Sequence, residues 1–113
     1  MIDINIEHRD QITLVAVSGR VDSMNANQFG DALTKEISDG NAHLVLDLSS
    51  VEYMSSAGLR EIVTSLKKAK KASGDLRLAQ PSQRVREVLE MAGLDQIFRL
   101  YDSQDEAFGS YSS

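Results

Sequence analysis

The chain has 113 residues, no cysteine and a formal net charge of -5 at pH 7. This length typically forms one domain with one core, so we expect residues 1–113 to be a single domain. The missing cysteines exclude a disulfide framework, a thiol nucleophile and a Cys-ligated metal. The acidic balance disfavours nucleic acid as a partner. No apolar run approaches a membrane span and the N-terminus is no signal peptide, so we expect a cytoplasmic protein.

The N-terminal residues have the pattern of a β-hairpin. Residues 2–8 alternate isoleucine with polar side chains, which is typical of a half-buried strand. A tight turn at Arg9 and Asp10 leads into a second strand over residues 12–17, which Gly19 ends. We therefore expect these two strands to pair with each other.

A helical pattern follows the hairpin. Asp22 or Ser23 caps this helix, which continues as far as Ser38 and stops at Gly40. Its apolar side chains recur at every fourth residue, as expected for one buried face. Methionine commonly fills gaps in a core, and we interpret three methionines in this way, with partial exposure as the alternative for the second: Met24, Met54 and Met91.

The central segment combines a buried strand with the best-defined helix. Residues 43–48 are apolar except for Asp47, which predicts a strand covered by helices. Residues 49–52 match the capping-box pattern Ser-x-x-Glu, but only a single helical turn fits before Gly58. A longer helix begins after Ser56 and ends among lysines, which suit a helix C-terminus. Its apolar stripe consists of Leu59, Ile62, Val63 and Leu66.

The next segment completes a strand–helix–strand unit. Gly74 and Asp75 turn the chain into a short strand over residues 76–79. A right-handed crossover makes this strand parallel to residues 43–48. Another helix begins at Ser82, after Pro81, and stops at Gly93. Its inward-facing residues are expected to be Val85, Val88, Leu89 and Ala92.

The C-terminal residues predict a last strand and a short helix. The strand spans residues 97–100, and Ser103 caps a terminal helix whose final Ser and Tyr residues fray. Taken together, the pattern predicts an α/β fold with about five strands and about four helices.

Two adjacent serines, Ser55 and Ser56, stand just before the best-defined helix. Free backbone N–H groups and the helix dipole favour negative charge at this position, so a phosphoryl group fits there. Serine is also a preferred N-cap residue, and capping is the commoner role of a serine before a helix. The spacing leaves open which of the two caps the helix and which points outward.

Motifs of enzymes and metal sites are missing from the sequence. There is no Gly-x-Ser-x-Gly elbow, Walker loop, Gly-x-Gly-x-x-Gly or His-Glu-x-x-His. His8 and His43 lie at opposite ends of predicted strands and have no spaced partners for a catalytic triad or a metal site. We therefore expect no catalytic residue, no metal and no cofactor.

Residues 47–60 read Asp-Leu-Ser-Ser-Val-Glu-Tyr-Met-Ser-Ser-Ala-Gly-Leu-Arg, residues 17–22 read Val-Ser-Gly-Arg-Val-Asp, and residues 85–98 read Val-Arg-Glu-Val-Leu-Glu-Met-Ala-Gly-Leu-Asp-Gln-Ile-Phe. These three segments, in this order, resemble the STAS domain family, in particular bacterial anti-sigma factor antagonists. The first is similar to the family signature, the second to its Gly-x-[Leu/Val]-Asp stretch, and the third to its late helix and strand. The resemblance implies one STAS domain over residues 1–113, with a mixed β-sheet.

The resemblance also implies a switching function. In that family the domain binds an anti-sigma factor that is also a serine kinase, which frees the sigma factor. Phosphorylation of one serine at the helix start breaks the complex, and a serine phosphatase resets it. By motif position that serine is Ser56, Ser55 stands where the family often has Asp, and Asp22 corresponds to the acid near the phosphorylated serine. The implied partner-binding residues are Asp22, Ser55, Ser56, Gly58 and Arg60.

The role of Gly58 and the function of the chain each have an alternative interpretation. Gly58 stands in the first helical turn, where glycine costs about 1 kcal/mol relative to alanine. It therefore indicates either unusual backbone angles or a surface kept bare for a partner, and we expect the second. The alternative function is a STAS-like accessory subunit of a stress-sensing or lipid-transport assembly, which uses the same surface without phosphorylation.

Overall fold

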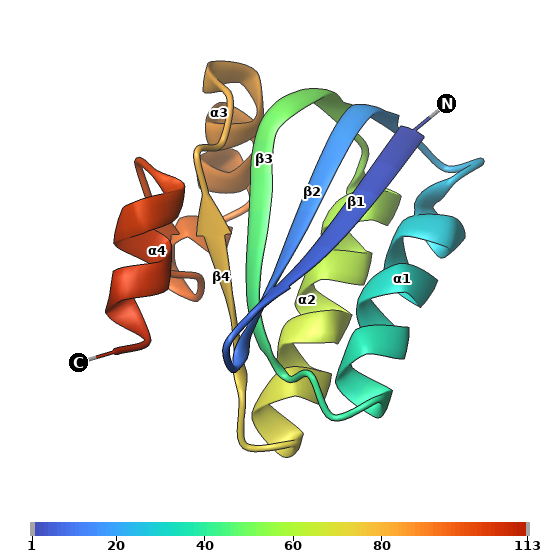
Figure 1. Ribbon diagram of the computed structural model, residues 1–113. Helices are drawn as coiled ribbons and strands as arrows, with labels where there is room; N and C mark the ends of the chain where they lie inside the picture. The colour runs from blue at the N-terminus through green and yellow to red at the C-terminus, as the bar shows by residue number, and fades with distance from the viewer. Residues whose placement is uncertain (1, 113) are drawn as a thin grey trace.

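The computed structural model describes residues 2–112, which form one five-stranded sheet with helices on both of its faces (Figure 1). The strands follow the order β1-β2-β3-β4-β5 across the sheet. The elements are β1 (Ile2–Arg9), β2 (Ile12–Val21), α1 (Ala26–Ser38), β3 (His43–Met54), α2 (Ser56–Lys71), β4 (Asp75–Ala79), α3 (Gln83–Met91), η1 (Leu94–Gln96), β5 (Leu100–Tyr101) and α4 (Gln104–Ser110). The predicted α/β class with a mixed sheet is confirmed.

The sheet mixes one antiparallel pair with three parallel pairs. β1 pairs antiparallel with β2, which confirms the predicted hairpin, while β2, β3, β4 and β5 pair in parallel. The predicted parallel pairing of β3 and β4 across the α2 crossover is thus confirmed. Parallel strands end at the same edge of a sheet, so β2 and β3 deliver their C-terminal residues side by side.

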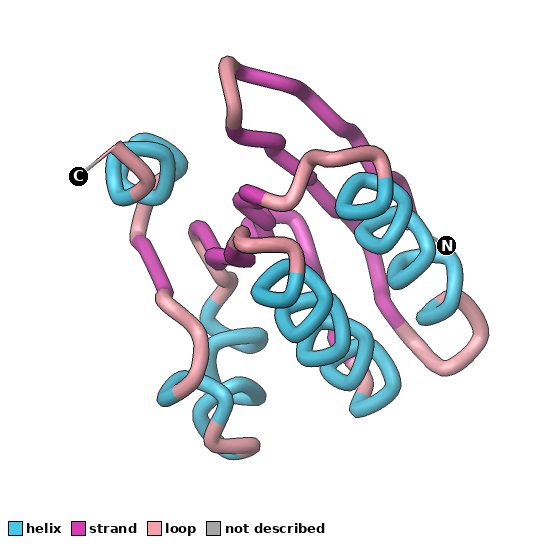
Figure 2. The backbone as a smooth tube through the Cα atoms, turned by 90° about the horizontal axis from the view of Figure 1, so that it is seen from below, coloured by secondary structure: helices cyan, strands magenta, loops and turns pink. Residues whose placement is uncertain are grey.

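The two faces of the sheet are covered unequally. Helices α1, α2 and α3 lie on one face, and the short helix α4 lies on the other (Figures 1 and 2). The larger core beneath the three helices includes Phe29, Leu46 and Ile62, all completely buried. The smaller cluster under α4 centres on Leu14, Val45, Ala79 and Ala107.

Two strands are longer than the sequence pattern indicates. β2 continues through Gly19 to Val21, because the glycine takes a φ of 101° next to a shift in register and the strand resumes. β3 continues to Met54, so residues 49–52 are part of the strand, with Ser50 and Val51 paired to β2, and form no helical turn. The capping-box pattern there is coincidental, since strand pairing takes the backbone groups that a helix needs.

Other boundaries and exposures also differ from the prediction. Helix α1 begins at Ala26 behind an N-cap at Asn25, and residues 97–100 are largely outside β5, which is only Leu100–Tyr101. Ala92 is exposed although its spacing placed it inward. Of the three methionines, Met54 is buried, whereas Met24 and Met91 are 91% and 88% exposed.

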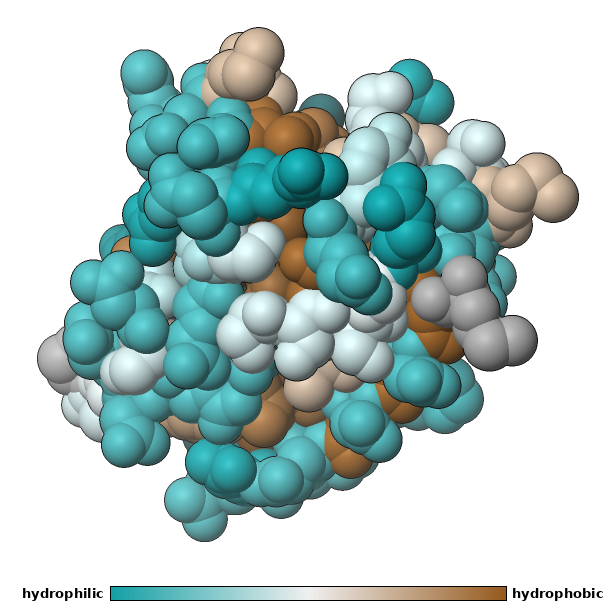
Figure 3. Space-filling view, turned by 90° about the horizontal axis from the view of Figure 1, so that it is seen from above, coloured by the Kyte–Doolittle hydropathy of each residue, from teal (hydrophilic) through white to brown (hydrophobic). Residues whose placement is uncertain are grey.

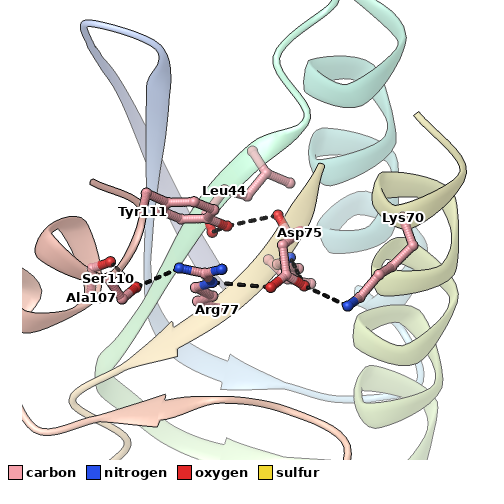
Figure 4. Close-up of polar contacts among 8 residues, drawn as sticks. Leu44, Lys70, Asp75, Arg77, Ala107, Ser110 and Tyr111 are labelled. Atoms are coloured by element: carbon pink, nitrogen blue, oxygen red, sulfur yellow. Dashed lines mark hydrogen bonds and ion pairs between the residues drawn. The ribbon is translucent and has the colours of Figure 1, made fainter. Parts of the chain in front are cut away.

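The C-terminal helix α4 is tied to the sheet by a polar network (Figure 4). Arg77 on β4 donates to Asp75 at 3.0 Å and to Ser110 on α4 at 2.7 Å. The hydroxyl of Tyr111 lies 2.7 Å from the carbonyl oxygen of Leu44 and 2.9 Å from that of Asp75. Burial raises the pKa of Tyr111, so this hydroxyl stays a donor. The expectation that the terminal Tyr residues fray is therefore wrong for Tyr111.

We expect Tyr111→Phe to lower the free energy of unfolding by about 1 kcal/mol, because the hydroxyl that joins α4 to two strands is lost. Tyr53→Phe is the matched control, since no hydrogen bond of the Tyr53 hydroxyl exists within residues 2–112 and its ring lies under Arg20. The control should change stability by less than about 0.5 kcal/mol. Urea unfolding of both variants measures the difference, and equal effects would contradict a clamping role for Tyr111.

Candidate functional site

The candidate site lies at the edge where the parallel strands β2 and β3 end. Val21 and Met54 are opposite each other at these ends, and the N–H of Ser55 donates to the carbonyl of Val21 at 2.8 Å. This bond holds the start of α2 against the loop that follows β2, which spans residues 22–25. Figure 3 looks onto this edge, where weakly polar and hydrophobic residues reach the surface between hydrophilic ones.

The two serines at the start of α2 have different roles in the structure. Ser55 is the N-cap, with φ -79° and ψ 168°, and its hydroxyl accepts a hydrogen bond from the N–H of Gly58 at 3.2 Å. Ser56 is the first helical residue and is exposed, and its hydroxyl has no hydrogen bond within residues 2–112. The structure therefore answers the question that the spacing left open: Ser55 caps the helix and Ser56 points outward.

Asp22 organises the loop beside these serines. Its carboxylate accepts hydrogen bonds from the N–H groups of Met24 at 2.9 Å and Asn25 at 3.2 Å. In return, the side chain of Asn25 accepts from the N–H of Asp22 and donates to the carbonyl of Arg20, both at 2.9 Å. Asp22 is thus half-buried within its own loop and shapes it, although Asn25 holds the N-cap position of α1.

Two exposed side chains flank this region. Arg60, one turn into α2, is exposed and has no ion pair within the described range 2–112. Met24 projects from the loop of Asp22 and is 91% exposed, an unusual state for a methionine. The interpretation of Met24 as a gap-filling core residue is therefore wrong, and the residue joins the candidate site. The sequence does carry a signal for the exposure of Met24, because this residue falls in a polar stretch before the apolar spacing of α1 begins.

The structure gives a different reason for a glycine at position 58 from the one expected. Gly58 is buried, and a Cβ atom there would overlap the sulfur of Met54 and lie 2.8 Å from Cγ1 of Val21. Its φ is negative, so backbone strain does not explain the glycine. Gly58 is needed for close packing of α2 against the ends of β2 and β3, and the idea that it keeps an outer surface bare is corrected.

Within residues 2–112, no three side chains that commonly bind metals come together. The same range contains no helix that is both long and apolar enough to cross a membrane.

The roles of the two serines predict unequal effects on stability. Ser55→Ala removes the helix cap and should lower the free energy of unfolding by about 1 kcal/mol. Ser56→Ala, at the next position, should leave it unchanged within about 0.5 kcal/mol because the exposed hydroxyl makes no internal bond. Chemical denaturation of the pair is an internally matched test. A larger loss for Ser56→Ala would reverse the assignment of the cap.

Substitution of Gly58 should damage the fold itself. We expect Gly58→Ala to destabilise the protein by about 1–2 kcal/mol, since overpacking outweighs the gain in helix propensity. Gly109→Ala is the control, because Gly109 is also helical but has nothing within 4 Å of an added Cβ. The control should be neutral or stabilising. Thermal unfolding measures both, and similar midpoints for the two variants would contradict the packing role.

Comparison with known proteins places the chain in one family. The model of the STAS domain matches residues 3–107. A candidate anti-sigma factor antagonist of Bordetella bronchiseptica, BtrV, is 31% identical over 97% of this chain and 95% of its own. The anti-sigma-F factor antagonist RsfB of Mycobacterium tuberculosis is 26% identical over 94% of this chain and 86% of its own.

A solved structure agrees with these relatives. The crystal structure of an anti-sigma factor antagonist from Mycobacterium paratuberculosis superimposes with a TM-score of 0.91 at 29% identity, covering 100% of this chain and 96% of that one. The sequence match spans nearly all of the sheet and helices described above, and the structural match spans the whole chain. The chain therefore belongs to the STAS domain family, and the relatives that it resembles bear the name of anti-sigma factor antagonists.

Proposed function

We propose that this chain is an anti-sigma factor antagonist that is switched off by phosphorylation of Ser56. In this proposal it binds an anti-sigma factor with serine kinase activity in the cytoplasm, and a serine phosphatase restores the binding form. The observation that carries the proposal is the exposed hydroxyl of Ser56 at the start of α2, which has no hydrogen bond among residues 2–112, next to a Ser55 hydroxyl already used as the cap.

The start of α2 suits a phosphorylated residue. Ser56 and Ala57 have N–H groups ahead of the first intrahelical bonds, and the helix is 16 residues long. A phosphate adds roughly -1.5 to -2 charge, which these N–H groups and the helix dipole stabilise. The modification should therefore leave the fold intact and act on the surface that a partner contacts.

The surface around Ser56 suits a protein partner. Met24 supplies an exposed apolar side chain, Arg60 an exposed charge without an ion pair among residues 2–112, and the carboxylate of Asp22 lies in the loop held against the helix start. Exposed apolar groups beside a few charges are typical of protein interfaces. We propose that Asp22, Ser55, Ser56 and Arg60 line the contact, with Gly58 supporting it from within. On this proposal the domain acts as ligand and kinase substrate, with no catalytic role.

The phosphorylation site can be tested directly. The kinase partner is first captured from native lysate on the immobilised protein and identified by mass. With that kinase and ATP, we expect peptide mapping to find phosphate on Ser56, and Ser56→Ala to abolish the modification. Phosphate on Ser55 alone would contradict the assignment. Stable binding without phosphorylation of either serine would favour the accessory-subunit alternative.

A charge-mimicking variant tests the effect on binding. Ser56→Asp should weaken the complex at least tenfold, about 1.4 kcal/mol, because a carboxylate is introduced into the contact. The thermal midpoint should stay close to that of the wild type, since an acid suits a helix start. Ser112→Asp, an exposed serine near the opposite edge beside His43 and Asp10, is the control for added charge. Calorimetric titration with the captured kinase measures the affinities. A collapse of the midpoint together with binding would indicate a structural role for Ser56.

A further inference from the structure

Strand β1 is an open edge of the sheet. It is eight residues long, pairs only with β2 among the described residues 2–112, and keeps a continuous register along its whole length. The opposite edge, β5, is only two residues long. Exposed edges are normally protected by proline, a bulge, short length or charged side chains, and of these β1 has only the charged residues Asp3, Glu7 and Arg9. Figure 2 shows the turn end of the β1–β2 hairpin standing clear of the helices. The edge is therefore available to another strand.

The hairpin geometry shows which backbone groups are available. Arg9 and Ile12 pair across a two-residue turn, which makes them a hydrogen-bonded pair. Hydrogen-bonded pairs alternate along a strand, so the odd-numbered residues of β1 bond to β2. The N–H and C=O groups of the even-numbered residues point outward from the sheet. These residues are Ile2, Ile4, Ile6 and His8.

The exposed hydrophobic residue of β1 is centrally placed among these outward groups. Ile2 is buried at 6% exposure, but Ile6, on the same face, is 39% exposed. A second strand laid along this edge would cover Ile6. In an antiparallel pair around a two-fold axis, a register centred on Ile6 places each Ile6 opposite its own copy.

Charge selects this register over its neighbours. Centred on Ile6, the pairing places Asp3 of each copy opposite Arg9 of the other. A register centred on Asn5 would place Asp3 of one copy opposite Glu7 of the other. A register centred on Glu7 would place the two copies of Glu7 opposite each other. Opposite charges across a strand pair are favourable and like charges are unfavourable. Arg9 is 44% exposed, and although it already contacts Glu7 and the ring of Phe108, its guanidinium has further donors.

We propose that this chain forms a two-fold symmetric homodimer in which β1 pairs antiparallel with β1 of a second copy, with Ile6 opposite Ile6 and Asp3 opposite Arg9. The sheet then continues from one copy into the other. Because the paired strands are antiparallel, the two edges that carry Ser56 point in opposite directions. Both remain free, so the dimer is independent of the proposed switch.

Charge exchange provides a register-specific test. Sedimentation equilibrium of the full chain should show a dimer for the wild type. Asp3→Arg and Arg9→Asp should each weaken the dimer at least tenfold, because like charges then face each other at both ends of the ladder. An equimolar mixture of the two variants should form a heterodimer, because both ends regain opposite charges. Asp95→Arg and Arg84→Asp, exposed residues outside the sheet, are the controls and should dimerise like the wild type.

A third variant guards against loss of folding in the first two. Ile6→Lys places a charge at the centre of the pairing and should also give a monomer, with the circular dichroism spectrum of the wild type. A wild type that stays monomeric at millimolar concentration overturns the proposal. So does a dimer that survives all three substitutions. A mixture of folded single variants that fails to associate overturns the register and with it the proposed pairing.

Discussion

The parallel pairing of β2 and β3, carried to its last residues, is the constraint on which the candidate site depends. It places Val21 opposite Met54 and allows the N–H of Ser55 to donate to the carbonyl of Val21. Val21 and Met54 are both buried, and Gly58 packs against them. The start of α2 is therefore held by the core below it and by the strand end beside it. A loop from one strand and a helix from the next become one surface.

The start of α2 combines a backbone held by the cap Ser55 with the exposed hydroxyl of the next residue, Ser56. Ser55 is held by its own capping bond, and the loop of Asp22 is held by reciprocal bonds with Asn25. Ser56, the next residue after Ser55, has an exposed hydroxyl. Because neighbouring residues make the hydrogen bonds that hold the backbone, a substitution or modification at Ser56 should change the stability of the fold little. Because the side chain is exposed, a partner bound on this edge would contact the changed group directly.

The remaining parts of the molecule keep this edge separate from the others. Helix α4 is fixed to β3 and β4 by Arg77, Ser110 and Tyr111, on the face of the sheet opposite α2. Strand β1 forms a lateral edge and ends in the hairpin turn at the other end of the strands. The three surfaces face different directions, so contact at one leaves the others accessible.

The sequence by itself determined the elements whose signal is local. The hairpin follows from alternation in residues 2–8, α2 from its apolar stripe, and the parallel β3–β4 pair from the crossover between them. The family follows from the motif around Ser56. The tertiary structure decided which side chains are covered and which are free. The position of Ser55 and the packing behind Gly58 depend on Val21 and Met54, residues brought together by strand pairing, and the exposure of Met24 depends on the loop that Asp22 shapes. Spacing along one segment carries no information on what another segment places above it, which is why these features required the folded chain.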